Sequence, residues 1–119
     1  MVTINLEDLT LEDVSKVFQN HREGNTIEYK RDLQIYSEKE TKEFLADVSS
    51  FANANGGTIF YGIDEQDGLV GIEIQELDTF RLRVQQKIED GILPRPSFKI
   101  KFLETSENKY IFIIQVHKS

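Results

Sequence analysis

Residues 51–64, FANANGGTIFYGID, decide how this chain folds. A helix-like run ends in Asn55-Gly56-Gly57, and an apolar segment over residues 58–63 follows at once. Glycine takes the left-handed conformation at a helix C-terminus without steric cost, so the glycine pair predicts the end of a helix. Segment 58–63 is apolar on both alternating faces, which is typical of a central strand covered on both sides. We therefore expect a helix and a buried strand joined by a tight turn.

A capping box predicts where that helix begins. The Ser37 hydroxyl can accept a hydrogen bond from the amide of Glu40, and the Glu40 side chain can reach back to the Ser37 amide. The apolar residues that follow recur on one stripe, so the helix should lie on a sheet. The stripe consists of Phe44, Leu45, Val48, Phe51 and Ala52. Before the helix, residues 27–30 (IEYK) alternate between apolar and charged, which predicts a strand with Ile27 and Tyr29 on one face.

The other elements follow from the same periodicities and turn signals. They are a helix over 11–18, a hairpin turn at Asp67-Gly68 that leads into a strand over 69–72, a less regular helix over 75–89 and strands over 97–103 and 110–116. Thr10 and Asp13 supply an N-cap signal for the first helix. We therefore expect an α/β (α+β) fold: a mixed β-sheet of about five strands with two long helices and a short N-terminal helix.

The composition is that of one globular domain. A chain of 119 residues can bury a single core and is too short for two, so residues 1–119 are taken as one domain. Apolar residues make up 39% and charged residues 29%, which excludes a disordered chain. No apolar run reaches the length of a membrane span, and the N-terminus lacks a secretory signal, so we expect a cytoplasmic protein without a membrane partner. Because cysteine is absent, any bound metal would need oxygen ligands.

Charge is unevenly distributed along the chain. Residues 1–78 carry six basic and seventeen acidic side chains, whereas residues 79–119 carry eight basic and four acidic ones. The net charge of −7 argues against a protein that coats nucleic acid. The basic C-terminal third is either a solvated surface or a patch that faces a polyanion. Its candidate nucleic-acid contacts are Arg81, Arg83, Lys87, Arg95, Lys99 and Lys101.

The glycine-rich turn does not have the pattern of a phosphate loop. No lysine-serine or lysine-threonine pair follows Asn55-Gly56-Gly57, and the glycines at 56, 57 and 62 do not fit G-x-G-x-x-G. The turn also runs from helix to strand, whereas phosphate binds where a helix begins. ATP binding is therefore not supported by any motif.

Three carboxylates form a candidate metal site. Asp64 ends the expected central strand, where α/β folds commonly place functional groups. Glu23 and Glu28 would be roughly 16 Å apart in an extended chain, but a bend at Gly24 could bring them together. If both meet Asp64, three oxygen ligands would suit Mg²⁺ or Mn²⁺, which could activate a water and bind a phosphodiester.

The basic residues beside Glu28 allow a simpler interpretation. Glu28 could form an ordinary surface ion pair with Lys30 or Arg31. Lys30 could instead contact a phosphate, and both roles stay open. Lys30 and Arg31 therefore join the candidate nucleic-acid contacts.

Two segments carry a resemblance to a known family. EGNTIEYKRDL (residues 23–33) and FLADVSSFANANGGTIFYGIDEQDGLVGI (residues 44–72) resemble the Schlafen AlbA_2 domain, also known as divergent AAA-4. The resemblance covers residues 20–116. Family members usually continue after the last strand with a proline and an arginine-glycine pair, which are missing here. We therefore expect the chain to be an N-terminal fragment of a longer protein.

The resemblance implies functions of different classes. Bacterial members imply a nucleic-acid-interacting, DNA-binding domain of a transcriptional regulator, which is our leading expectation. The Schlafen branch implies an alternative, a Mg²⁺- or Mn²⁺-dependent endoribonuclease acting on structured RNA such as tRNA. Its metal-binding and catalytic carboxylates fall on Glu23, Glu28 and Asp64, with Lys30 assisting. The Schlafen enzymes use two such lobes, so a homodimer could supply the second. A protein-interaction or dimerisation module is the third alternative.

Overall fold

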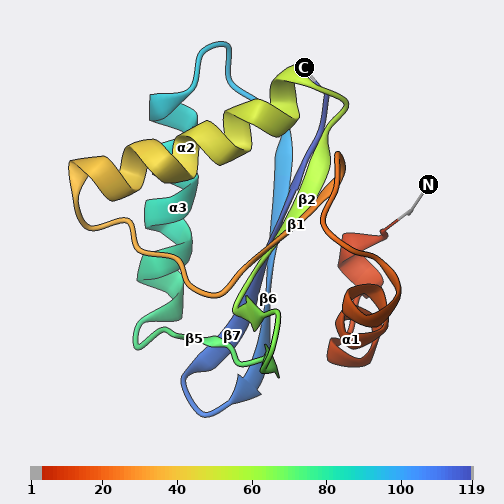
Figure 1. Cartoon of the computed structure of the whole chain (residues 1–119). Helices are drawn as coiled ribbons and strands as arrows, with labels where there is room; N and C mark the ends of the chain where they lie inside the picture. Colours follow the sequence, from red (N-terminus) through yellow and green to blue (C-terminus); the bar gives the residue numbers. More distant parts are fainter. Residues whose placement is uncertain (1–3, 119) are drawn as a thin grey trace.

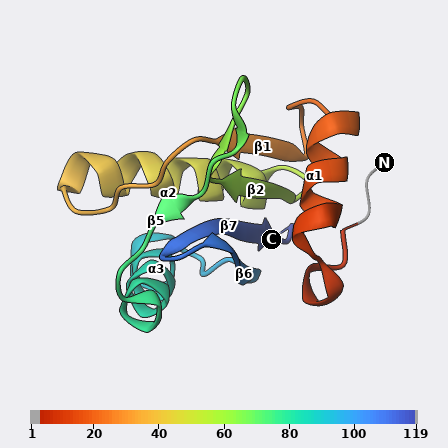
Figure 2. The same cartoon turned by 90° about the horizontal axis from the view of Figure 1, so that it is seen from below.

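A mixed β-sheet lies between two helical layers in the computed structural model, which describes residues 4–118 (Figure 1). Helices α2 (Glu38–Asn53) and α3 (Leu77–Gly91) cover one face of the sheet. Helix α1 (Leu11–Asn20), preceded by a 3₁₀ turn η1 (Leu6–Asp8), covers the other face, as Figure 2 shows from a perpendicular direction. Three α-helices and a five-stranded mixed sheet within this range confirm the predicted α+β class.

The sheet has the strand order β1-β2-β7-β5, and β6 pairs with β7. The strands are β1 (Ile27–Lys30), β2 (Gly57–Tyr61), β5 (Ile72–Glu73), β6 (Phe98–Ser106) and β7 (Lys109–Val116). β1 runs parallel to β2, and the other pairs are antiparallel. A separate hairpin consists of β3 (Ile63–Asp64) and β4 (Gly68–Leu69). Because β1 and β2 are parallel, the residues that follow them meet at one edge of the sheet.

The turn between α2 and β2 forms as the sequence predicts. The capping box at Ser37 is present, with the Ser37 hydroxyl accepting from the Glu40 amide at 3.1 Å. At the other end, Gly56 has a φ of +81°, in the left-handed region that favours glycine. Its N–H donates to the carbonyl of Phe51 at 2.9 Å. This bond folds the chain back so that β2 can run beneath the helix it has just left.

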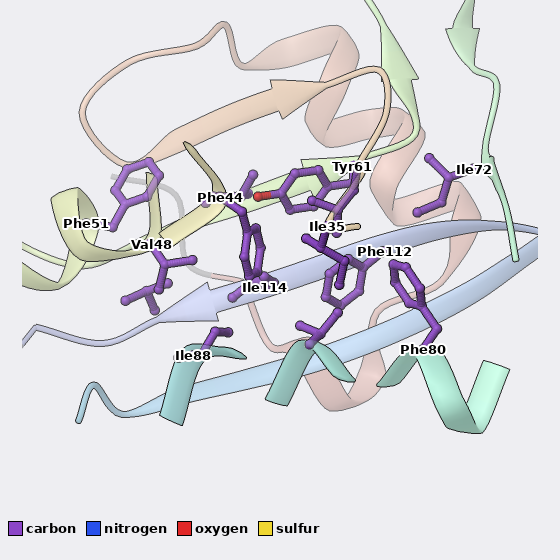
Figure 3. Packing of buried hydrophobic residues seen from close by; sticks show 14 of the residues in the cluster. Ile35, Phe44, Val48, Phe51, Tyr61, Ile72, Phe80, Ile88, Phe112 and Ile114 are labelled. Carbon is purple, nitrogen blue, oxygen red and sulfur yellow. The ribbon is translucent and has the colours of Figure 1, made fainter. Parts of the chain in front are cut away.

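The two faces of the sheet bury separate hydrophobic clusters. On the α2–α3 side, Phe44 and its neighbours pack on Tyr61 and Phe112, whose rings stack at 5.5 Å (Figure 3). On the α1 side, Val14 packs with Phe60 and the apolar residues of β1 and β7. Tyr61 and Phe60 are neighbours in β2 and enter opposite clusters. This confirms the prediction of a central strand covered on both sides.

The structure differs from the sequence expectations where local signals are weak. β2 ends at Tyr61 because Gly62, with a φ of +97°, turns the chain out of the strand. Helix α3 begins at Leu77, and its N-cap, Glu76, makes no side-chain capping bond. The strand expected over residues 69–72 is divided in two: Leu69 ends β4, and Ile72 begins β5, which pairs with β7 through Ile72 and Tyr110. Gly71, with a φ of +76°, turns the chain between them.

Candidate functional site

Strand β1 presents its charged side chains on the face that packs against α2. Ile27 and Tyr29 are buried on the α1 side, so alternation directs Glu28 and Lys30 to the opposite face. The Nζ atom of Lys30 lies 3.3 Å from a carboxylate oxygen of Glu28 and 3.3 Å from one of Asp47 on α2. Burial opposes the ammonium charge, but the carboxylates of Asp47 and Glu28 outweigh burial and raise the pKa of Lys30. Lys30 thus bridges a strand carboxylate and a helix carboxylate.

Glu23 and Glu28 line one open cavity of about 530 Å³, which Asp47 also borders. The bend at Gly24 that this requires is present, because the Gly24 N–H donates to the carbonyl of Ile27 at 3.0 Å. The turn therefore brings the two glutamates that the sequence separates by five positions to the same cavity.

The charge state of Glu23 reflects this crowding. Burial and then the negative charges of Glu28 and Glu65 raise the pKa of the Glu23 carboxyl. A hydrogen bond from the Tyr29 backbone amide and the charge of Lys30 offset only part of this effect. The cavity therefore disfavours negative charge on Glu23.

Asp64 is held by its own turn and by a basic residue from the neighbouring strand end. One carboxylate oxygen accepts from the amides of Asp67 at 2.9 Å and Gln66 at 3.1 Å. The other lies 3.2 Å from Nη1 of Arg31, which follows β1. The hydrogen bond from the Asp67 amide lowers the pKa of the Asp64 carboxyl, and the Gln66 amide and Arg31 lower it further. Burial acts in the opposite direction but does not outweigh these effects.

Glu23, Glu28 and Asp64, the three carboxylates expected to bind Mg²⁺ or Mn²⁺, do not converge on one point in the structure. The carboxylate of Glu28 is engaged by Lys30, and that of Asp64 is engaged by Arg31 and two backbone amides. Across residues 4–118, no group of three or more histidine or acidic side chains is arranged to hold a metal ion. Glu23 and Glu28 come together, whereas Asp64 is held outside their cavity.

The basic residues of the C-terminal third lie on two faces of the sheet. Lys99 and Lys101 alternate with the apolar residues of β6 and therefore face η1. Lys101 Nζ donates to the Glu7 carbonyl at 2.7 Å, and Lys99 Nζ lies 4.0 Å from the Glu7 carboxylate. Arg81, Arg83 and Lys87 lie on α3, on the opposite face, and Arg95 lies in the exposed segment after α3. The predicted basic residues thus divide into two groups.

A second open cavity, of about 400 Å³, lies between the segment after β1 and the beginning of α3. Arg31, Tyr36 and Lys109 line it together with Asp32 and Glu73. The guanidinium carbon of Arg83 lies 5.5 Å from the centroid of the Tyr36 ring. This cavity combines an aromatic ring with two cations and two carboxylates.

Three residues of these sites, Asp47, Tyr36 and Lys109, were not among the candidates from the sequence. Asp47 could have been found, because it lies in the helix between the buried Phe44 and Val48 and so borders the stripe that faces the sheet. Tyr36 and Lys109 carry no local signal, since their proximity depends on how distant strands pair.

These features define a class: a small three-layered α+β domain with charged sites beside a parallel strand pair. A sequence model of the family described as "Schlafen, AlbA_2" matches residues 23–119, which is more than half of the chain. The chain therefore belongs to the Schlafen AlbA_2 family.

One solved structure with a similar fold is the N-terminal domain of a RecG-related protein, named for an ATP-dependent DNA helicase, from Nitrosomonas europaea. The two share 16% identity with a TM-score of 0.52, and the match covers 87% of this chain and 69% of that one. At this identity the likeness concerns the fold alone. A search of curated protein sequences gave no significant match. Within residues 4–118, every helix is too short or too polar to cross a membrane.

Proposed function

We propose that this domain binds nucleic acid through α3, as the nucleic-acid-interacting part of a bacterial regulator-like protein. The observation that carries the proposal is the central part of α3, which lies between Asp78 in the first turn and Glu89 and Asp90 in the last. Residues 79–88 contain three basic side chains and no acidic one, in a chain whose net charge is −7. We define the α3 basic surface as Arg81, Arg83 and Lys87. Family membership and the helicase-related name of the structural neighbour support the same class of ligand.

The members of the α3 basic surface lie on the two flanks of the helix, between its buried side and its outward side. Phe80, Val84 and Ile88 are buried, so the opposite side of α3 faces outward. Arg83 and Lys87 are four residues apart and lie on one flank of that side, whereas Arg81 lies on the other flank. Among the described residues, no carboxylate lies within 4.0 Å of any member of the α3 basic surface. All three side chains are half-buried, and the guanidinium carbon of Arg81 lies 4.9 Å from the centroid of the Phe102 ring. No carboxylate of the described residues neutralises their charge, so in the proposed mode they contact phosphates from the two flanks of the helix.

Binding of labelled tRNA, single-stranded DNA and duplex DNA at two salt concentrations tests the proposal. We expect the Arg83→Ala/Lys87→Ala double variant to bind more weakly, with a salt slope smaller by about one for each phosphate that the variant no longer neutralises. The matched control is Lys16→Ala/Lys42→Ala, because these exposed helical lysines already pair with Glu12 and Glu38. Equal weakening in both double variants would contradict the assignment to α3. Absence of binding to all three nucleic acids at low salt would overturn the proposal and favour a protein-interaction module.

A metal-dependent endoribonuclease is a second candidate, favoured by the shared cavity of Glu23 and Glu28, on which the family resemblance places two catalytic carboxylates. As placed, Asp47 rather than Asp64 borders that cavity. The test is cleavage of tRNA with Mn²⁺ by the wild type and by Glu28→Gln. Cleavage by the wild type alone would support the candidate. Cleavage by neither protein, or by both equally, would overturn it.

A further inference from the structure

Tyr36 is an exposed aromatic ring on a fixed backbone. Its side chain is 73% exposed, whereas the adjacent Ile35 is only 1% exposed and anchors the chain in the core. On the other side, the Glu40 carboxylate accepts from the amides of Tyr36 at 3.2 Å and Ser37 at 2.9 Å. The ring is therefore held out from the surface by a backbone that is tied down on both sides.

Two cations without a carboxylate partner among the described residues lie near this ring. Arg83 lies over the ring at 5.5 Å, within the range of a cation–π contact. Lys109 lines the adjoining cavity of about 400 Å³. Within the part of the chain that the structure describes, neither Arg83 nor Lys109 has a carboxylate within 4.0 Å. Both cations can therefore contact phosphate.

The two carboxylates that line the cavity are engaged elsewhere. Asp32 accepts from the Leu33 amide at 2.8 Å and from the Gln34 side-chain amide at 3.2 Å. Glu73 accepts from the Gln75 side-chain amide at 2.9 Å. These bonds hold the two acids in place, and Glu73 lies directly opposite Lys109 in the pairing of β5 with β7 without an ion pair between them.

We infer that Tyr36 stacks against an unpaired base while Arg83 and Lys109 contact the phosphates beside it, so that the domain prefers single-stranded or looped nucleic acid. The inference rests on the proposed function and specifies its ligand. An aromatic ring beside cations is the combination that binds single strands, because each base offers a π-face to the ring and the backbone offers charge. In a duplex the bases are stacked on one another, and an exposed ring cannot reach their faces.

Fluorescence provides a direct test, because the chain contains no tryptophan. Tyr36→Trp introduces a single probe at the ring. We expect a single-stranded oligonucleotide to quench its emission more strongly than a duplex of the same sequence. We expect Tyr36→Ala to weaken single-strand binding by about five- to 150-fold, the effect of losing one stacked base. Tyr36→Phe keeps the ring and should retain the affinity.

The matched control is Leu93→Ala, which removes another exposed apolar side chain, 87% exposed in the segment after α3. It should bind as the wild type does. If the wild type binds no nucleic acid, the proposed function itself fails. If the wild type binds single strands but Tyr36→Ala binds them equally well, the stacking inference is overturned and the proposed function stands. Stronger binding to duplex than to single strands by the wild type would also overturn it.

Discussion

Replacing Gly56 with alanine tests how the turn between α2 and β2 holds the fold together. Gly56 has a φ of +81°, and a Cβ atom added there would lie 2.7 Å from the carbonyl oxygen of Val116 and 3.1 Å from the amide nitrogen of Lys118. Both atoms belong to the backbone at and just after the end of β7, so the collision cannot be relieved by rotation of a side chain. The Gly56 N–H also donates to Phe51 at 2.9 Å, and a shift of the turn would weaken this bond.

The expected loss of stability has two parts. A residue with a Cβ atom in the left-handed conformation costs roughly 1–2 kcal/mol. The collision with Val116 adds about 1–3 kcal/mol, the usual cost of overpacking a well-packed site. Gly56→Ala should therefore reduce the free energy of unfolding by about 2–5 kcal/mol in total.

Gly68→Ala is the matched control. Gly68 has a φ of +78°, close to that of Gly56, but an added Cβ atom there would meet nothing within 4 Å. This variant should lose only the conformational part, roughly 1–2 kcal/mol. Urea unfolding followed by circular dichroism measures both variants against the wild type. Equal losses would show that the collision of the added Cβ atom with the end of β7 costs no stability, and would refute the reasoning.

Three further substitutions test the charged and buried groups. The Tyr61 hydroxyl is buried without a hydrogen-bond partner among the described residues, so Tyr61→Phe should leave the free energy of unfolding unchanged or raise it by up to about 2 kcal/mol; a loss would contradict this. The pKa of Glu23 is raised in the folded state, so its ionised form destabilises the fold and stability falls as pH rises through that pKa. Glu23→Gln should therefore be more stable than the wild type at neutral pH, with the difference shrinking in acid; a difference independent of pH would disprove the assignment. Lys30→Met leaves Glu28 and Asp47 without their shared cation. The free energy of unfolding should fall by about 1 kcal/mol at low salt and by less at high salt, because salt screens the ion pairs. A loss that does not depend on salt would argue against an electrostatic role of Lys30.

The elements with signals inside a few residues could be predicted from the sequence. The capping boxes at Thr10 and Ser37 and the turn at Gly56 each need only neighbouring residues, and all three are present. The expected helix over residues 75–89 begins and ends two residues too early compared with α3 (Leu77–Gly91). The N-cap of α3, Glu76, forms no side-chain hydrogen bond that could mark the boundary. The strand expected over residues 69–72 divides at Gly71 into β4, which pairs with β3, and β5, which pairs with β7, and this division depends on partners that are distant in the sequence.

The candidate site divides in the same way. The meeting of Glu23 and Glu28 could be anticipated, since a single local turn at Gly24 produces it. The ion pair between Asp64 and Arg31 could not be anticipated, because the parallel pairing of β1 with β2 brings the two residues together. The ion pair between Lys30 and Asp47 could not be anticipated either, because it requires α2 to pack on the face of the sheet to which Lys30 points.

The placement of charge explains how an acidic domain could bind a polyanion. Glu23, Glu28 and Asp47 border one cavity, with Lys30 between two of them. Residues 79–88 of α3 carry only positive charge, and the acidic residues of this helix lie at its ends. Charges are screened beyond about 8–10 Å at physiological salt, so a phosphate at α3 responds to the cations near it far more than to the net charge of the chain. The same phosphate would be repelled at the acidic cavity. In the proposed binding mode, the net charge of −7 therefore restricts nucleic acid to the side of α3 and Tyr36 instead of excluding it.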